Sequence, residues 1–324
     1  MAIAARSFAK INIGLRIGPR REDGFHELRT IYQTLAIHDV VRVDVGRGVG
    51  INVYCKNPQV PSDETNTCCR VAERVLHTLK TRGKVRITIE KNLPVQGGLG
   101  GASSNAVVTI LALERALKLQ LTPTDRLRIA SEVGSDLPLF LTGGTMLGIG
   151  RGEQVYPLED LPSIPCVVAT PPIGVSTPLA FAEWDKKLKE QKLTSLEHSI
   201  TMNEFSHSIY EWLGRSNGSS TGVPEKSWDR AETLLLDLVR AGIENDFETV
   251  VFSLHPAIRE VKRVLERSGA RYSSLSGSGS TVYGLFDDAE TAATAAAGLN
   301  EKGIPAQATC TLTRVEYWKE MFRK

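Results

Sequence analysis

Residues 91–106 read Lys91-Asn92-Leu93-Pro94-Val95-Gln96-Gly97-Gly98-Leu99-Gly100-Gly101-Ala102-Ser103-Ser104-Asn105-Ala106, and they lie between two segments of different periodicity. Before them, Val85, Ile87 and Ile89 alternate with polar residues, which predicts a half-buried strand. After them, apolar residues recur at helical spacing as far as Leu117, with no glycine or proline. The predicted order is therefore a strand, a glycine loop and a helix.

This order favours an anion-binding site. Glycines let backbone N–H groups approach a ligand closely, and a helix N-terminus adds unpaired N–H groups and the positive end of its dipole. Two standard templates do not fit, because no lysine follows the glycines as in a P-loop, and Ser103 stands where a dinucleotide fingerprint needs its third glycine. A flexible glycine turn without a ligand is the alternative, although four glycines within five residues exceed what a turn requires. A phosphate group is the expected ligand.

The composition is that of an ordinary globular protein. The chain has 324 residues, enough for one large or two ordinary domains, and 41% of them are hydrophobic while 23% are charged. The formal net charge is +2 and aromatic residues make up 6%, so nothing indicates a nucleic-acid partner. No run approaches the ~18 apolar residues of a membrane span, and the first residues lack the apolar core of a signal peptide. We expect neither membrane insertion nor secretion.

The five cysteines are expected to be free thiols. They are odd in number, lack C-x-x-C spacing, and include the adjacent pair Cys68 and Cys69, which disfavours both a zinc site and a disulfide framework. Free thiols are typical of a reducing compartment, so we expect a cytoplasmic protein. The composition and the small net charge favour small molecules as partners.

Two further segments carry candidate catalytic residues, each with a structural alternative. A strand is predicted over residues 7–17, and it places Lys10 and Asn12 on its polar face, which could also be the solvated side of an edge strand. Asp136 stands between Gly134, where a helix is expected to end, and an apolar run. This position suits a helix N-cap as well as a catalytic base, and the two roles are compatible.

Two loops carry candidate binding residues. The polar loop over residues 20–28 contains one aromatic-histidine pair, Phe25 and His26, which could equally be a turn with a buried phenylalanine. Residues 276–280 read Ser-Gly-Ser-Gly-Ser, which suits either a hairpin turn or a second phosphate-facing loop.

The remaining segments alternate between strands and helices, which predicts an α+β sandwich. The proline-rich residues 157–165 mark a domain boundary, and residues 193–228 read as an insertion with few apolar repeats. Further strands are expected at 40–45, 51–55, 145–158 (two strands turning near 150–152), 166–170, 272–275, 282–286 and 308–312, and helices at 67–81, 122–134, 178–191, 230–241, 247–253, 257–267 and 288–299.

Residues 94–104 resemble the phosphate loop of the GHMP small-molecule kinases, which include galacto-, homoserine, mevalonate and phosphomevalonate kinases. Within this superfamily, four other motifs are together similar to the family that phosphorylates the 2-hydroxyl group of 4-diphosphocytidyl-2-C-methyl-D-erythritol in the non-mevalonate isoprenoid pathway. The resemblance covers nearly the whole chain apart from the insertion, with Phe25 where that family usually has tyrosine and Ala102 where it often has glycine. The four motifs are Ala9-Lys10-Ile11-Asn12, Asp23-Gly24-Phe25-His26, Gly134-Ser135-Asp136-Leu137-Pro138 and Leu275-Ser276-Gly277-Ser278-Gly279-Ser280.

The resemblance implies the two-domain α+β GHMP kinase fold. The N-terminal domain, resembling ribosomal protein S5, would occupy residues 1–160 and bind ATP. The C-terminal ferredoxin-like α/β sandwich would occupy residues 161–324 and include the insertion. The active site would lie in the cleft between them.

The resemblance also implies a role for each candidate residue. Asp136 would accept the proton of the substrate hydroxyl group, and Lys10 would hold Asp136 ionised and stabilise developing charge. Phe25 and Phe181 would stack on the two faces of the cytosine, with His26 at its edge and Asn12 touching the substrate. Asn66 would lie near the nucleotide base. The ATP phosphates would be bound by Pro94, Gly97, Gly98, Leu99, Gly100, Gly101, Ala102, Ser103 and Ser104.

Magnesium is expected with ATP, and Ser103 or Ser104 is a candidate ligand, although the sequence does not identify one. Both a monomer and a homodimer are compatible with the sequence.

Two other functions are weighed. Another GHMP kinase, of the mevalonate or homoserine type, would share the glycine loop but not the aromatic-histidine pair. A regulatory nucleotide-binding module would need neither Lys10 nor Asp136.

Overall fold

The structure is a computed structural model that describes residues 2–191, 202–209 and 243–323. The predicted helix at 230–241 and most of the predicted insertion at 193–228 lie outside the described residues. Within the insertion, residues 202–209 form a helical segment whose Phe205 and Ile209 pack into the core beside the first strand.

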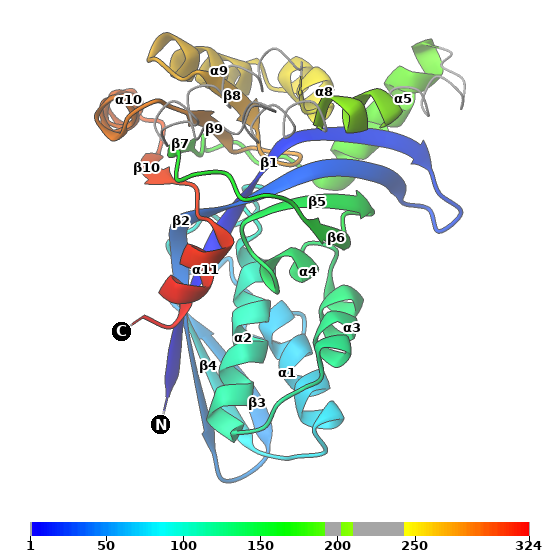
Figure 1. Cartoon of the computed structure of the whole chain (residues 1–324), viewed down its shortest axis with the longest axis vertical. Coiled ribbons are helices and arrows are strands. Elements are labelled where there is room, and N and C mark those ends of the chain that lie inside the picture. Colours follow the sequence, from blue (N-terminus) through cyan, green and yellow to red (C-terminus); the bar gives the residue numbers. More distant parts are fainter. Residues whose placement is uncertain (1, 192–201, 210–242, 324) are drawn as a thin grey trace, which may run out of the picture.

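The first sheet is built on two long antiparallel strands, β1 (Ile3–Arg20) and β2 (His26–Gly46), which run across the molecule as one hairpin (Figure 1). The other edge of β2 pairs with two strands in succession, because β5 (Thr145–Gly150) pairs near its start and β4 (Lys84–Glu90) near its end. Outermost are β3 (Gly50–Cys55), parallel to β4, and β6 (Gln154–Pro157), antiparallel to β5. The sheet order is thus β3-β4-β2-β5-β6, with β1 on the free edge of β2.

Helices cover one face of this sheet. They are α1 (Thr67–Thr78), α2 (Gly101–Leu117), α3 (Pro123–Val133) and the short α4 (Leu137–Phe140) (Figure 1). Helix α2 is apolar on most of its circumference and lies at the centre of the layer, in contact with β1, β2 and α1. The glycine loop therefore leads directly into the central helix of this layer.

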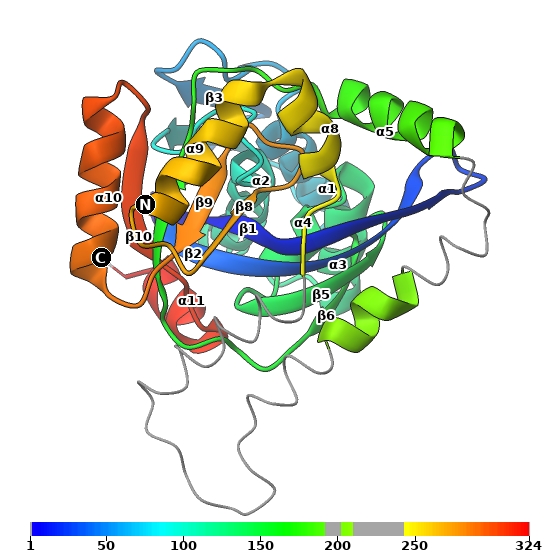
Figure 2. The same ribbon diagram turned by 90° about the horizontal axis from the view of Figure 1, so that it is seen from above.

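The second sheet is antiparallel throughout, in the order β10 (Ala306–Cys310), β7 (Pro165–Ala169), β9 (Val282–Leu285) and β8 (Tyr272–Leu275). Helices α8 (Phe247–Leu254), α9 (Pro256–Arg267) and α10 (Ala289–Glu301) lie above it, and α5 (Thr177–Gln191) extends beside the tip of the β1–β2 hairpin (Figures 1 and 2). The hairpin thus contacts both halves of the chain.

The two sheets are joined directly. A bridge pairs Leu35 of β2 with Thr311, which follows β10. The last helix, α11 (Arg314–Met321), then returns to the first half, where Tyr317 and Met321 are buried in the core between the first sheet and its helices. The strands change from one sheet to the other between residues 157 and 165, whereas α11 packs with the first sheet. The division at residue 160 stays a prediction.

The two-sheet α+β fold is confirmed, and the largest error in the predicted elements concerns β2. The sequence predicts a polar loop over 20–28 and a strand only at 40–45, whereas the strand begins at His26. Alternation is missing over this part because both faces are covered: Ile31, Tyr32, Gln33 and Thr34 are all buried. Other boundaries move less, since β1 extends beyond 7–17 and α2 begins at Gly101.

All five cysteines lie in the described part of the chain and are free thiols, as predicted. Burial raises the pKa of the Cys68 thiol to about 12. Among the described residues, no helix combines the length and the apolar character needed to cross a bilayer.

Candidate active site

Two cavities meet at the glycine loop. The first, which we call the loop pocket, has a volume of about 380 Å³ and is lined by residues 94–103 together with Asn66, Lys91 and Asn105. The second, the cleft pocket, has a volume of about 710 Å³ and is lined by residues of both halves of the chain. Gly98 lines both. The residues of the cleft pocket include Lys10, Asn12, Arg20, Phe25, His26, Tyr32, Asp136, Arg151, Phe181, Asp185, Gly277 and Ser278.

The glycine loop is packed against the second glycine-rich loop, residues 276–280. Gly98 has a φ of +80°, and a Cβ atom there would lie 2.2 Å from the carbonyl oxygen of Ser276. The Ser276 hydroxyl donates a hydrogen bond to the Gly98 carbonyl (3.0 Å), and the Thr281 N–H donates to the Gly97 carbonyl (3.3 Å). The second loop is thus a hairpin connection between β8 and β9 that also forms part of the site.

Lys10 and Asn12 are buried, so the interpretation of this strand face as solvated is wrong. Lys10 is 4% exposed and Asn12 2%. The Lys10 ammonium donates to Asn12 Oδ1 (2.7 Å) and lies 3.6 Å from Asp136 Oδ2, while Asn12 Nδ2 donates to the Thr30 hydroxyl (2.8 Å). The backbone N–H of Lys10 donates to the Leu99 carbonyl (3.0 Å), which ties β1 to the glycine loop.

Asp136 precedes α4, but within the described chain its side chain makes no capping hydrogen bond. The carboxylate instead faces Lys10 and accepts a long hydrogen bond from the Tyr32 hydroxyl (3.4 Å). Burial, followed by the charge of Asp136, raises the pKa of Tyr32 well above its ordinary value, so this hydroxyl stays protonated and can donate. The geometry favours the chemical role of Asp136 over the capping role.

The aromatic-histidine pair reaches the cleft pocket, where α5 completes it. His26 stacks on Phe181 with ring centroids 4.9 Å apart and an interplanar angle of 9°, and its Nε2 lies 2.7 Å from Asp185 Oδ1. Phe25 is 53% exposed, and the Arg151 guanidinium lies 4.9 Å from the centre of its ring. All three predicted side chains therefore line the cleft pocket, and His26 is stacked on one face of Phe181.

The sequence alone did not identify Arg151 or Asp185. Arg151 was part of the expected turn between β5 and β6, and Asp185 part of a charged helix. One signal was available for Asp185, because it follows Phe181 by four residues and so shares its helix face.

In the loop pocket, most of the predicted residues line the cavity, but Ser104 does not. Its side chain is fully buried and accepts a hydrogen bond from the Ser7 hydroxyl (2.7 Å), whereas Ser103 lines the pocket. Asn66 also lines it, although its amide caps α1 by accepting from the Cys68 N–H (2.8 Å) and donates to the Pro61 carbonyl (2.6 Å). Among the described residues, no group of three or more His, Cys, Asp or Glu side chains could hold a metal ion by itself.

Two family models match the sequence. Residues 66–144 match the GHMP kinases N-terminal domain, and residues 229–305 match the GHMP kinases C-terminal domain. Two curated relatives are both called 4-diphosphocytidyl-2-C-methyl-D-erythritol kinase. The protein of Solibacter usitatus is 34% identical over 87% of this chain and 81% of its own length, and that of Acaryochloris marina is 33% identical over 88% and 87%. The chain belongs to the 4-diphosphocytidyl-2-C-methyl-D-erythritol kinase family.

Solved structures agree with this assignment. A crystal structure of 4-(cytidine 5'-diphospho)-2C-methyl-D-erythritol kinase superposes with a TM-score of 0.70 at 28% identity, covering 95% of this chain and 99% of that one. The homoserine kinase of Cytophaga hutchinsonii reaches the same TM-score at 18% identity, covering 96% and 95%, which shows the shared fold alone. As a member of the 4-diphosphocytidyl-2-C-methyl-D-erythritol kinase family, the protein is an ATP-dependent small-molecule kinase.

Proposed function

We propose that the protein transfers the γ-phosphoryl group of ATP to the 2-hydroxyl group of 4-diphosphocytidyl-2-C-methyl-D-erythritol. The observation that carries this proposal is the junction of the two pockets at Gly98, beside Lys10 and Asp136. A phosphoryl donor in the loop pocket and an alcohol in the cleft pocket would meet there. The names of the relatives at 34% and 33% identity supply the identity of the alcohol.

ATP would bind in the loop pocket. Its phosphates would accept hydrogen bonds from the backbone N–H groups of residues 97–101 and would lie at the positive end of α2, which begins at Gly101. Asn66, which lines the pocket, would lie near the base, and Ser103 would add a hydroxyl group. Phosphoryl transfer needs positioning and charge neutralisation more than covalent chemistry, and this loop supplies both.

Asp136 would accept the proton of the attacking hydroxyl group. Lys10, 3.6 Å away, would stabilise the charge that develops on the transferring phosphoryl group. The hydrogen bond from Lys10 to Asn12 and the bond from Asn12 to Thr30 fix the ammonium in this position. Lys10 and Asp136 are therefore the catalytic pair of the proposal.

Magnesium would accompany ATP and neutralise part of its phosphate charge. The donor set suits such an ion, since Mg²⁺ commonly takes few protein ligands and fills its shell with phosphate oxygens and water. Ser103 is the better of the two candidate serines, because the Ser104 hydroxyl is buried against Ser7.

The cleft pocket would hold the cytidyl substrate. Phe25, His26 and Phe181 would bind the cytosine, with Asn12 near the reacting end, and the guanidinium groups of Arg20 and Arg151 would offset the diphosphate charge. The free thiols favour a cytoplasmic location, and either a monomer or a homodimer would suit the site.

The test is to incubate the protein with ATP and Mg²⁺ and to measure ADP release with the cytidyl compound, mevalonate or homoserine. Of the three alcohols, we expect ADP release only with the cytidyl compound. Equal turnover of mevalonate or homoserine would instead favour the alternative function, that of a GHMP kinase of the mevalonate or homoserine type. Absence of ADP release with all three would contradict the proposal.

A further inference from the structure

Asp39 is a fully buried carboxylate of β2 that lies behind the glycine loop. Its Oδ1 accepts hydrogen bonds from the backbone N–H groups of Asn92 (2.7 Å) and Leu93 (2.8 Å). Its Oδ2 accepts from the Lys91 ammonium (2.6 Å) and from Asn105 Nδ2 (3.1 Å). One side chain thus holds the beginning of the loop and the first turns of α2 together.

The two side chains that donate to Asp39 belong to the loop pocket. Lys91 and Asn105 both line that cavity. A Cβ atom on Gly101, the first residue of α2, would lie 2.9 Å from the Lys91 ammonium and 3.6 Å from Asp39 Oδ2. The ion pair therefore lies directly against the helix N-terminus, where the proposed function places phosphate groups.

The position of Lys91 needs an electrostatic explanation. A cation beside the positive end of a helix dipole is unfavourable, and a buried charge without a partner is costly. Asp39 offsets both effects in the free protein, because its carboxylate contacts the ammonium at 2.6 Å. The pair keeps a positive charge at the site where an anionic ligand would use it.

The hydrogen bonds of Asn105 indicate how the site would adapt to a neutral side chain at position 39. Its Oδ1 is buried and has no hydrogen-bond partner among the described residues, while its Nδ2 is bound to Asp39. In Asp39→Asn, the new Oδ1 can keep both backbone N–H groups, and Asn105 can turn its amide so that its free oxygen accepts from the new Nδ2. Lys91 alone would lose its partner, so this substitution isolates the ion pair.

We propose that Asp39 is a positioning residue of the nucleotide site, which fixes the Lys91 ammonium against the first turn of α2 for the phosphate charge of the nucleotide. The proposal rests on the proposed function, since it needs ATP in the loop pocket. It assigns to a buried residue of β2 a role that acts through Lys91 and without contact between Asp39 and the ligand.

The experiment compares direct binding of ATP and of adenosine to the full-length protein and to Asp39→Asn by calorimetry. We expect the Kd for ATP to rise about tenfold or more, which corresponds to ~1.4 kcal/mol, while the Kd for adenosine changes by less than about twofold because it carries no phosphate. The KM of the alcohol substrate should not change. Lys91→Met should weaken ATP binding similarly, and the double variant should be no weaker than Lys91→Met alone.

Glu114→Gln is the matched control. Glu114 is a buried carboxylate of α2, 6% exposed, that lies far along the helix from the loop. It accepts hydrogen bonds from Arg126 Nε (2.9 Å) and the Leu121 N–H (2.6 Å). It should lower the melting temperature without changing ATP affinity. Equal weakening of ATP binding in both variants, or unchanged binding in Asp39→Asn, would overturn the role of Asp39. If Asp39→Asn does not fold, ATP binding to Lys91→Met tests the proposal in its place, and unchanged binding in that variant overturns the proposal. A native protein that does not bind ATP overturns the proposed function as well.

Discussion

Asp136 and Lys10 lie in different elements, yet their side chains are 3.6 Å apart. Lys10 is nearly inaccessible, whereas the Asp136 side chain is 34% exposed to the cleft pocket. This asymmetry suits a fixed cation beside a carboxylate that a substrate can reach. The carboxylate is the group that would exchange a proton, and the cation is the group that stays in place.

The first prediction concerns this carboxylate. Asp136→Asn should lower kcat by ~10²–10⁴, because a neutral amide cannot accept the hydroxyl proton. The KM for ATP and the melting temperature should change little, since the side chain makes no capping bond within the described chain. Steady-state kinetics and thermal unfolding check this. A large fall in melting temperature with retained kcat would instead make Asp136 a structural residue.

At the scale of elements, the two glycine loops meet at Gly98. A side chain at Gly98 would hinder the close approach of phosphates to the backbone, and the structure adds a nearer obstacle, because the carbonyl oxygen of Ser276 lies 2.2 Å from the position that a Cβ atom would occupy. The requirement for glycine thus arises from packing between the two halves of the chain as well as from the positive φ. The nucleotide loop and the second loop form one structural unit.

The second prediction follows from this contact. Gly98→Ala should raise the KM for ATP at least tenfold and lower the melting temperature, because the left-handed conformation costs ~1–2 kcal/mol and the loops must separate. Gly298→Ala is the control: among the described residues, no atom beyond its chain neighbours and the adjoining helix backbone lies within 4 Å of its added Cβ, and its position in α10 is helical. That change should be neutral or stabilising by up to ~1 kcal/mol. Unchanged kinetics in Gly98→Ala would show that the loop is an ordinary turn.

The sequence predicted most elements close to their bounds, the fully buried strands β8 and β9 among them, and failed over the first half of β2. The order of strand, glycine loop and helix around residues 91–106 follows from local periodicity, and the structure confirms it. The first half of β2 was missed because it is buried on both faces, which removes the alternation. A sequence pattern predicts which residues share a face of an element, but it does not indicate how many faces other elements cover.

The site was predictable to the extent that its residues stand in local motifs. Lys10, His26 and Asp136 lie in such motifs and line one cavity. Asp39 and Asp185 make their contacts with Lys91 and His26, which are 52 and 159 positions away in the sequence. These contacts depend on tertiary structure, and the one local signal is the position of Asp185 four residues after Phe181.

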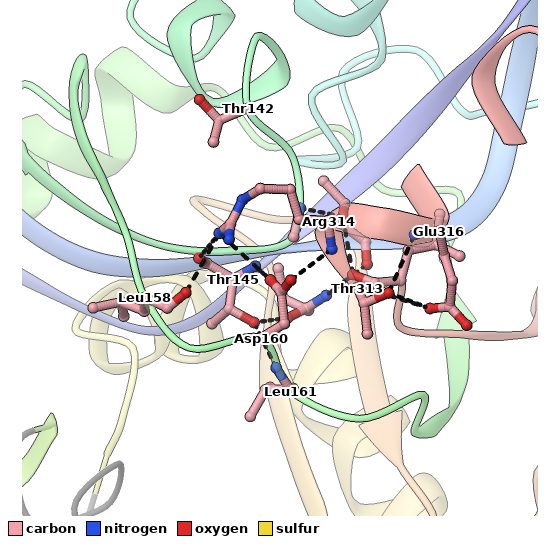
Figure 3. Close-up of polar contacts among 12 residues, drawn as sticks. Thr142, Thr145, Leu158, Asp160, Leu161, Thr313, Arg314 and Glu316 are labelled. Atoms are coloured by element: carbon pink, nitrogen blue, oxygen red, sulfur yellow. Dashed lines mark hydrogen bonds and ion pairs between the residues drawn. The ribbon is translucent and has the colours of Figure 1, made fainter. Parts of the chain in front are cut away.

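At the scale of the whole molecule, one polar cluster joins the connection between the sheets to the last helix (Figure 3). Asp160 accepts from the backbone N–H groups of Thr145 (3.0 Å) and Arg314 (2.8 Å). The Arg314 guanidinium lies 3.4 Å from Asp160 Oδ1 and donates to the carbonyls of Thr145 (3.1 Å) and Leu158 (3.4 Å). The cluster fixes α11 against the first sheet at the point where the chain passes to the second.

The third prediction tests this cluster. Asp160→Asn should lower the free energy of unfolding by ~1–3 kcal/mol, because it removes a charged acceptor from several hydrogen bonds in a partly buried site. The kcat and both KM values should stay within about twofold, a range equivalent to ~0.4 kcal/mol. Glu260→Gln, in an exposed pair with Arg267, is the control and should change stability by less than ~0.5 kcal/mol. Equal stability of the two variants, measured by denaturant unfolding, would contradict the prediction.

The cleft pocket is completed by both halves of the chain, since His26 comes from the start of β2 and Asp185 from α5. In the tautomer of His26 that donates Nε2–H to the Asp185 carboxylate, 2.7 Å away, Nδ1 is an acceptor. An acceptor suits the amino group of cytosine and opposes the carbonyl group that uracil has in its place. Asp185 would thus select the pyrimidine by fixing the tautomer of His26.

The last prediction is therefore that Asp185→Ala weakens recognition of the cytidyl substrate without affecting ATP. The substrate KM should rise about tenfold, or ~1.4 kcal/mol, and discrimination against the uridyl analogue should fall, because the released His26 can present either tautomer. Glu183→Gln, on the same helix and paired with Lys186 at the surface, should leave both KM values unchanged. The measurement is the ratio of kcat/KM for the cytidyl and uridyl compounds in the native protein and both variants. A ratio unchanged by Asp185→Ala would mean that His26 does not read the base through its tautomer, and an equal rise in the KM for ATP would mean that α5 supports the whole cleft rather than one ligand.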